Sequence, residues 1–132
     1  MILYASQTRL IGVNPTCETL VVTCIDFRLQ QHLDGWLATH VGHGNYDRVS
    51  IAGGVKNWEV VIAQIEIAIR LHRVQRVILM NHEDCGTYGW QGTVERHKAD
   101  LAAAQQQVWS KFPTVTVETY LIRLDGSQER CG

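Results

Sequence analysis

The sequence has little proline, no excess charge of either sign and no long apolar run. Its 12 basic and 13 acidic residues give a net charge of −1, which argues against the clustered Lys and Arg of nucleic-acid-binding or polybasic membrane-surface proteins. No apolar run approaches the roughly 20 residues of a transmembrane helix. Only 2 of the 132 residues are proline and 11 are glycine, a balance that suits tight turns between regular elements.

A secretory signal is also missing from the start of the sequence. Met1 to Leu10 show no basic segment followed by an apolar one, so we expect a cytoplasmic protein. In that reducing compartment, the four cysteines are expected to bind metal, catalyse or lie buried rather than form disulfides. The length predicts one domain over residues 1–132, and the 45% hydrophobic content argues against disorder.

Strand-like and helix-like segments alternate along the chain. The strand-like segments are short and rich in β-branched residues: Thr19–Cys24, Arg48–Ala52, Arg76–Met80 and Thr114–Leu124. The helix-like segments have apolar residues at helical spacing: Leu29–Val41, Asn57–Arg73 with Asn57 as the cap, and Thr93–Lys111. This order predicts an α/β fold with a doubly wound, mainly parallel sheet of four or five strands, in the order 2-1-3-4 and with helices on both faces. Asp125–Gly132 is interpreted as a polar tail.

Residues able to bind metal follow the first and third predicted strands. Ligands of such sheets bind beyond the carboxyl ends of the strands at the switch point. Cys24–Arg28 (Cys-Ile-Asp-Phe-Arg) follows the first strand, and His82–Gly86 (His-Glu-Asp-Cys-Gly) follows the third. The two thiolates and one imidazole of Cys24, Cys85 and His82 suit tetrahedral zinc, and three protein ligands leave a fourth position for water or substrate.

Asp26 and Arg28 lie beside this expected zinc site. Asp26 could occupy the fourth position itself or accept a hydrogen bond from a water held there, and Arg28 could pair with it and keep it ionised. The alternative is that Cys24 and Cys85 are buried apolar side chains, with His82 a hydrogen-bonded core histidine. Three ligand-type residues converging on one switch point favour the metal.

Both motifs resemble those of a known enzyme family. Cys24–Arg28 and His82–Gly86 are similar to the Cys-x-Asp-x-Arg and His-x-x-Cys-Gly zinc motifs of β-class carbonic anhydrases. Ile51–Gly54 (Ile-Ala-Gly-Gly) resembles the turn that follows the second strand of that family. The resemblance covers residues 19–86 well and the remainder weakly, which is typical of a short, divergent member.

The resemblance implies a zinc lyase in which Cys24, His82 and Cys85 bind Zn²⁺ and in which Asp26 and Arg28 form the catalytic pair. The implied reaction is the reversible hydration of carbon dioxide to bicarbonate by a zinc-bound hydroxide. Relatives on the same scaffold hydrolyse carbonyl sulfide or carbon disulfide, which gives one alternative. In some family members the aspartate ligates the metal, which gives another: a non-catalytic zinc-binding dimer closed by Asp26.

A small, apolar substrate calls for apolar pocket walls. We expect Phe27, at a position where the family most often has Ser, to line the substrate pocket. Gly53 and Gly54 are expected there because glycine lets the backbone approach a ligand closely. For Ile25 and Val55, packing in the core is the favoured interpretation.

The remaining histidines and cysteines carry no motif. We expect the histidines on the solvated surface, with His43 the strongest candidate for a proton shuttle. The histidines are His32, His40, His43, His72 and His97. Cys17 and Cys131 have no motif partners and are assigned no role.

The predicted helix Asn57–Arg73 is apolar on nearly all sides. Between Val60 and Leu71, nine of twelve residues are apolar, whereas a helix that covers one face of a sheet needs only a stripe. We therefore expect a homodimer or higher homo-oligomer, as the family resemblance also implies. The expected partners are this second subunit and a small-molecule substrate, with no nucleic acid or membrane.

Overall fold

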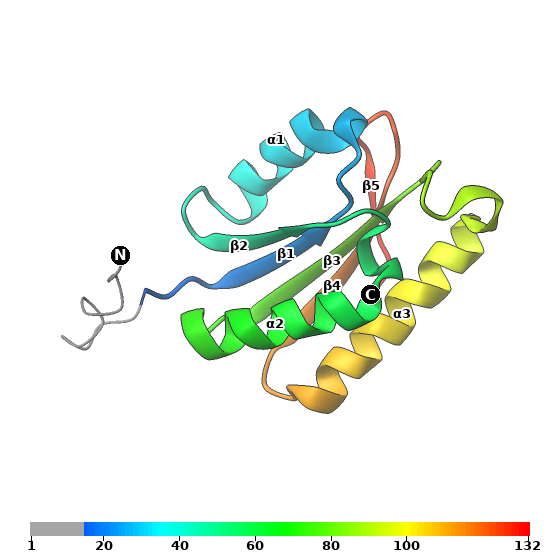
Figure 1. Cartoon of the computed structure of the whole chain (residues 1–132). Helices are drawn as coiled ribbons and strands as arrows, with labels where there is room; N and C mark the ends of the chain where they lie inside the picture. Colours follow the sequence, from blue (N-terminus) through cyan, green and yellow to red (C-terminus); the bar gives the residue numbers. More distant parts are fainter. Residues whose placement is uncertain (1–14) are drawn as a thin grey trace, which may run out of the picture.

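The computed structural model describes residues 15–132, which form a five-stranded sheet between helices (Figure 1). The strand order is β2-β1-β3-β4-β5, and the first four strands are parallel. The strands are β1 (Thr19–Thr23), β2 (Tyr46–Ser50), β3 (Arg76–His82), β4 (Thr116–Ile122) and β5 (Gln128–Arg130). The helices are α1 (Gln30–His40), α2 (Trp58–His72) and α3 (Val94–Lys111), and a short 3-10 turn precedes each of them. The predicted α/β class and the order 2-1-3-4 are confirmed.

Two apolar layers hold the helices against the sheet, because successive side chains of a strand point to opposite faces. Leu20 and Val22 of β1 pack in the layer beneath α2 and α3, together with Ile65 and Leu101. Val21, between them, packs in the layer beneath α1. All five residues of β1 are buried, as expected for a central strand of a parallel sheet that is covered on both faces.

The interpretation of Asp125–Gly132 as a polar tail is wrong, since its middle part forms β5. This strand pairs antiparallel with β4, and Tyr120 lies opposite Arg130. The Asp125 carboxylate accepts a hydrogen bond from the Ser127 N–H at 2.8 Å, and Gly126 has a φ of +91°. Asp-Gly is a common turn pair, but the polar residues after it lack the apolar alternation that would mark a hairpin in the sequence.

Element boundaries shift by a few residues from those predicted. The edge strand β2 begins at Tyr46 and ends at Ser50, so it lies two residues earlier than expected. Asn57 is the residue that precedes α2, but its side chain makes no capping hydrogen bond. Among residues 15–132, no helix is both long enough and apolar enough to cross a membrane.

Candidate metal centre

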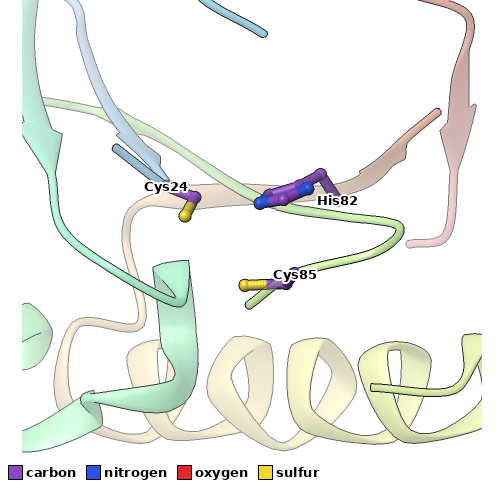
Figure 2. Close-up of side chains that lie close together, drawn as sticks. All are labelled: Cys24, His82 and Cys85. Carbon is purple, nitrogen blue, oxygen red and sulfur yellow. The ribbon is translucent and has the colours of Figure 1, made fainter. Parts of the chain in front are cut away.

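The carboxyl ends of β1 and β3 bring the two predicted motifs together. These strands are parallel neighbours, with Thr19 opposite Arg76. Cys24 follows β1 directly, His82 is the last residue of β3, and Cys85 comes from the loop beyond it. Figure 2 shows the two thiols and the imidazole turned toward a common space. The ligand atoms of Cys24, His82 and Cys85 all lie within 4.8 Å of one another.

The hydrogen bonding of His82 prepares one ring nitrogen for a ligand. Its Nδ1 lies 2.7 Å from the Glu83 carbonyl oxygen, which can only accept, so Nδ1 carries the proton and Nε2 has a free lone pair. Nε2 is buried and has no hydrogen-bond partner among the described residues. A buried polar atom without a partner costs free energy, and a metal ion would satisfy it.

The two cysteines complete a donor set that fits zinc. Cys24 and Cys85 are 5% and 4% exposed, so both sulfurs lie out of bulk water. The Gly53 N–H donates to Cys24 Sγ at 3.3 Å, which fixes the position of this sulfur. Two sulfurs and one imidazole nitrogen are a ligand set of catalytic zinc sites, in which the fourth position stays open.

Asp26 lies at the edge of this group in a fixed orientation. Its Oδ2 is 3.8 Å from His82 Nε2. Arg28 donates to both carboxylate oxygens, through Nε to Oδ1 at 3.0 Å and through Nη2 to Oδ2 at 2.7 Å. The hydrogen bonds from Arg28 lower the pKa of Asp26 to about 2, so the carboxylate is ionised at neutral pH.

Arg28 also ties the two motif loops to each other. It donates to the carboxylate and to the carbonyl oxygen of Asp84, both at 3.0 Å. Asp84 has a φ of +55°, a left-handed conformation that turns the chain between His82 and Cys85. One guanidinium therefore links Asp26, from the loop after β1, to the turn that carries Cys85.

A cavity of about 710 Å³ opens at the metal centre. Phe27, 86% exposed, is among its lining residues. Ile25 also lines it and is 58% exposed, so its expected place in the core is wrong, because β1 ends at Thr23 and the chain leaves the sheet there. Val55 is buried as expected.

Gly53 and Gly54 lie next to the centre but are not among the residues that line the cavity. Gly53 has a φ of +84° and presents its N–H to Cys24 Sγ. Gly54 has a φ of +59° and packs against Asn81 and the Met80 carbonyl oxygen. The Gly-Gly turn therefore positions the Cys24 sulfur and packs against the end of β3.

Beneath this turn is a buried polar network that was not predicted. The Asn81 side chain accepts from the Val55 N–H at 3.1 Å, donates to the Tyr88 hydroxyl at 3.0 Å and lies 3.0 Å from His97 Nδ1. The surface position expected for His97 is wrong: it is 1% exposed, and burial lowers its pKa. Its spacing of four residues from Leu101 on α3 was the signal, since both lie on the helix face that is buried.

Comparison with known proteins gives the family. A family model described as "Putative carbonic anhydrase" matches residues 14–130. The chain belongs to this family. It is 31% identical to an uncharacterized protein of Rickettsia conorii, in an alignment that covers 86% of this chain and 71% of the relative.

Solved structures share the fold at low sequence identity. A carbonic anhydrase from Glaciozyma antarctica superposes with a TM-score of 0.69 and 15% identity, covering 96% of this chain and 92% of that one. A carbon disulfide hydrolase superposes with a TM-score of 0.65 and 13% identity, and the match covers 96% of this chain and 84% of that one. A structure from a study of two tetrameric β-carbonic anhydrases of Sordaria macrospora superposes with a TM-score of 0.55 and 16% identity. This match covers 96% of this chain and 85% of that one. The resemblance to β-class carbonic anhydrases is confirmed at the level of family and fold.

Proposed function

We propose that this chain is a zinc-dependent carbonic anhydrase that interconverts carbon dioxide and bicarbonate. The observation that carries the proposal is the buried, unpartnered Nε2 of His82, grouped within 4.8 Å with the sulfurs of Cys24 and Cys85. These three residues would hold the metal and leave one position open. Zinc held there would supply a Lewis acid that lowers the pKa of water toward the neutral range.

Asp26 orients the attacking water in this proposal. Its carboxylate would accept a hydrogen bond from the attacking water and so direct an oxygen lone pair toward the carbon of carbon dioxide. With a pKa of about 2, Asp26 stays an acceptor throughout the neutral range and does not store the proton that the reaction releases. That proton passes to buffer.

Arg28 keeps Asp26 from becoming a fourth ligand. Both carboxylate oxygens already accept hydrogen bonds from the guanidinium, and Oδ1 also accepts from the Arg28 N–H at 2.9 Å. Movement of Asp26 onto a metal would break this charge-assisted, bidentate pair. This supports an open, catalytic site over a closed, non-catalytic one.

Hydrolysis of carbon disulfide or carbonyl sulfide is the second candidate function. The cavity mouth carries two exposed apolar side chains, Phe27 and Ile25, which suit a larger and less polar heterocumulene than carbon dioxide. The fold is shared with a carbon disulfide hydrolase. Parallel rate measurements with the three substrates would rank them.

We also propose that α2 pairs with a second copy of the chain. Val60, Ile67 and Leu71 are 43%, 36% and 47% exposed on this helix, an apolar surface that a second subunit would cover. Light scattering of the full chain is expected to give at least twice the mass of one chain, and Ile67→Lys is expected to reduce it. A single-chain mass for the unaltered protein would overturn the pairing.

The proposed activity can be tested by stopped-flow measurement of carbon dioxide hydration. Zinc-loaded protein is expected to accelerate the reaction, and Cys24→Ser is expected to lose both the acceleration and the zinc bound by Cys24, His82 and Cys85. Cys131→Ser is the matched control because Cys131 is a free, exposed cysteine remote from the motifs. Equal rates for Cys24→Ser and the unaltered protein would contradict the proposal.

A further inference from the structure

A second group of ligand-type side chains lies at the opposite end of the strands, where β1 and β2 begin. Cys17 precedes β1, Asp47 belongs to β2, and His72 is the last residue of α2. One sulfur, one carboxylate oxygen and one imidazole nitrogen from these residues lie within 4.8 Å of one another. Cys24 follows Cys17 by seven residue steps of nearly extended chain, a distance on the order of 20 Å at about 3.3 Å per residue. The group is therefore distinct from the centre described above.

The fold holds all three residues in place through backbone contacts. The Cys17 N–H donates to the His72 carbonyl oxygen at 3.1 Å, which ties the start of β1 to the end of α2. Asp47 lies directly opposite Leu20 in the β1–β2 ladder. Strand register and the end of a helix therefore bring these three side chains together.

The side chains themselves already interact. His72 Nδ1 lies 2.6 Å from Asp47 Oδ2, and these two side chains are 33% and 30% exposed. Burial, followed by the negative charge of Asp47, raises the pKa of the Cys17 thiol, which is the opposite of what an activated nucleophile needs. A hydrolytic or redox role for this cysteine is therefore disfavoured.

A divalent cation accounts for the combination of donors. Thiolate, imidazole and carboxylate together match the ligand preferences of zinc and similar ions. A cation would offset the repulsion between a thiolate and a carboxylate in close proximity. A cavity of about 200 Å³, lined by both Asp47 and His72, gives water or a small anion access to the group.

We propose that Cys17, Asp47 and His72 form a second site for a divalent metal of the zinc type, with three protein ligands and one open position. Binding releases the thiol proton and uses an imidazole lone pair. The site does not rest on the proposed carbonic anhydrase activity. It sits where β1, β2 and α2 meet, so an ion there would join the edge strand to the helix that covers it.

The test is a titration of the metal-free full chain with Co²⁺, followed by absorption of the thiolate-to-cobalt charge-transfer band. The unaltered protein is expected to bind two ions per chain, one at each group. Cys17→Ser and, independently, His72→Gln are expected to bind one. Cys131→Ser, which alters a free cysteine outside both groups, is expected to keep two.

The charge-transfer band identifies the ligand as well as the stoichiometry. The second equivalent is expected to add thiolate absorption in Cys131→Ser and none in Cys17→Ser. Binding of a single ion by the unaltered protein that Cys17→Ser binds equally well, or binding of two ions by both Cys17→Ser and His72→Gln, would overturn the second site. Either result would leave the proposal for Cys24, His82 and Cys85 intact.

Discussion

Arg28 holds both carboxylate oxygens of Asp26, at 3.0 Å from Nε to Oδ1 and 2.7 Å from Nη2 to Oδ2. The same guanidinium is bound to Asp84 in the turn that leads to Cys85. This arrangement fixes an ionised acceptor 3.8 Å from the free nitrogen of His82. The proposed chemistry depends on that acceptor remaining outside the metal's ligand set.

Asp26→Asn tests the acceptor role. An amide is nearly isosteric but loses the negative charge and presents an N–H₂ donor at one of its two positions. We expect the hydration rate to fall roughly 10- to 100-fold while zinc content stays unchanged, since a residue that orients a ligand acts at about this magnitude. Asp34→Asn is the matched control, because Asp34 is an exposed aspartate that also pairs with an arginine, Arg48. Unchanged activity in Asp26→Asn would remove Asp26 from the mechanism.

Arg28→Gln tests whether Arg28 keeps the site open. Without the guanidinium, Asp26 loses its bidentate partner and is free to approach the metal. In the Cys17→Ser background, loaded with one equivalent of zinc, we expect X-ray absorption of Arg28→Gln to report a carboxylate oxygen ligand, together with loss of activity. A variant with full activity and an unchanged zinc spectrum would show that Arg28 does not control the fourth position.

Gly54→Ala tests the packing beneath the centre, and Gly35→Ala is its control. A Cβ on Gly54 would overlap Asn81 Oδ1 and lie 2.9 Å from the Met80 carbonyl oxygen, in a backbone with a φ of +59°. We expect Gly54→Ala to lower the free energy of unfolding by roughly 2 kcal/mol or more. Gly35 lies within α1 with nothing within 4 Å of an added Cβ, so Gly35→Ala is expected to stabilise by about 0.5–1 kcal/mol. Urea denaturation measures both, and equal effects would contradict the description of the turn.

The ion pair between β3 and β4 predicts a pH dependence of stability. Arg76 donates to both carboxylate oxygens of Glu118, at 2.7 and 3.1 Å, and these hydrogen bonds lower the pKa of Glu118. A lowered pKa in the folded state adds stability above the usual value of 4.5, and this contribution is lost as the pH falls through the folded-state value.

Glu118→Gln is therefore expected to lower the free energy of unfolding by roughly 1–2 kcal/mol at neutral pH, with the difference shrinking below about pH 4. Glu66→Gln, which removes an exposed pair with Arg70 on α2, is the control and is expected to have a smaller effect. Urea denaturation at a series of pH values measures both. A difference for Glu118→Gln that does not change with pH would contradict the prediction.

The metal centre at the ends of β1 and β3 could be predicted from the sequence because each of its motifs is a short, continuous segment. Cys24 and His82 each follow an apolar run, and parallel neighbours in a doubly wound sheet must place such ends together. The strand order followed from the alternation of elements. The hairpin at Asp125 and Gly126 carries no such signal, because the residues of β5 are polar.

The group of Cys17, Asp47 and His72 could not be found from the sequence. Its members come from three different elements, and their meeting depends on which residue of β2 lies opposite Leu20 and on where α2 ends. A shift of one residue in that register would turn Asp47 to the other face of the sheet. The burial of His97 likewise depended on which face of α3 meets the sheet.

The most direct test of the central claim is a titration of zinc into the metal-free Cys17→Ser variant while the carbon dioxide hydration rate is recorded by stopped flow. In this background, Cys24, His82 and Cys85 form the remaining three-ligand group among residues 15–132. The rate at about pH 9 is expected to rise in proportion to zinc and to level off at one equivalent, because this pH favours the ionised form of a zinc-activated water even where two thiolate ligands weaken its activation. A rate equal to that of buffer with one equivalent bound would contradict the assignment of this centre as a carbonic anhydrase site.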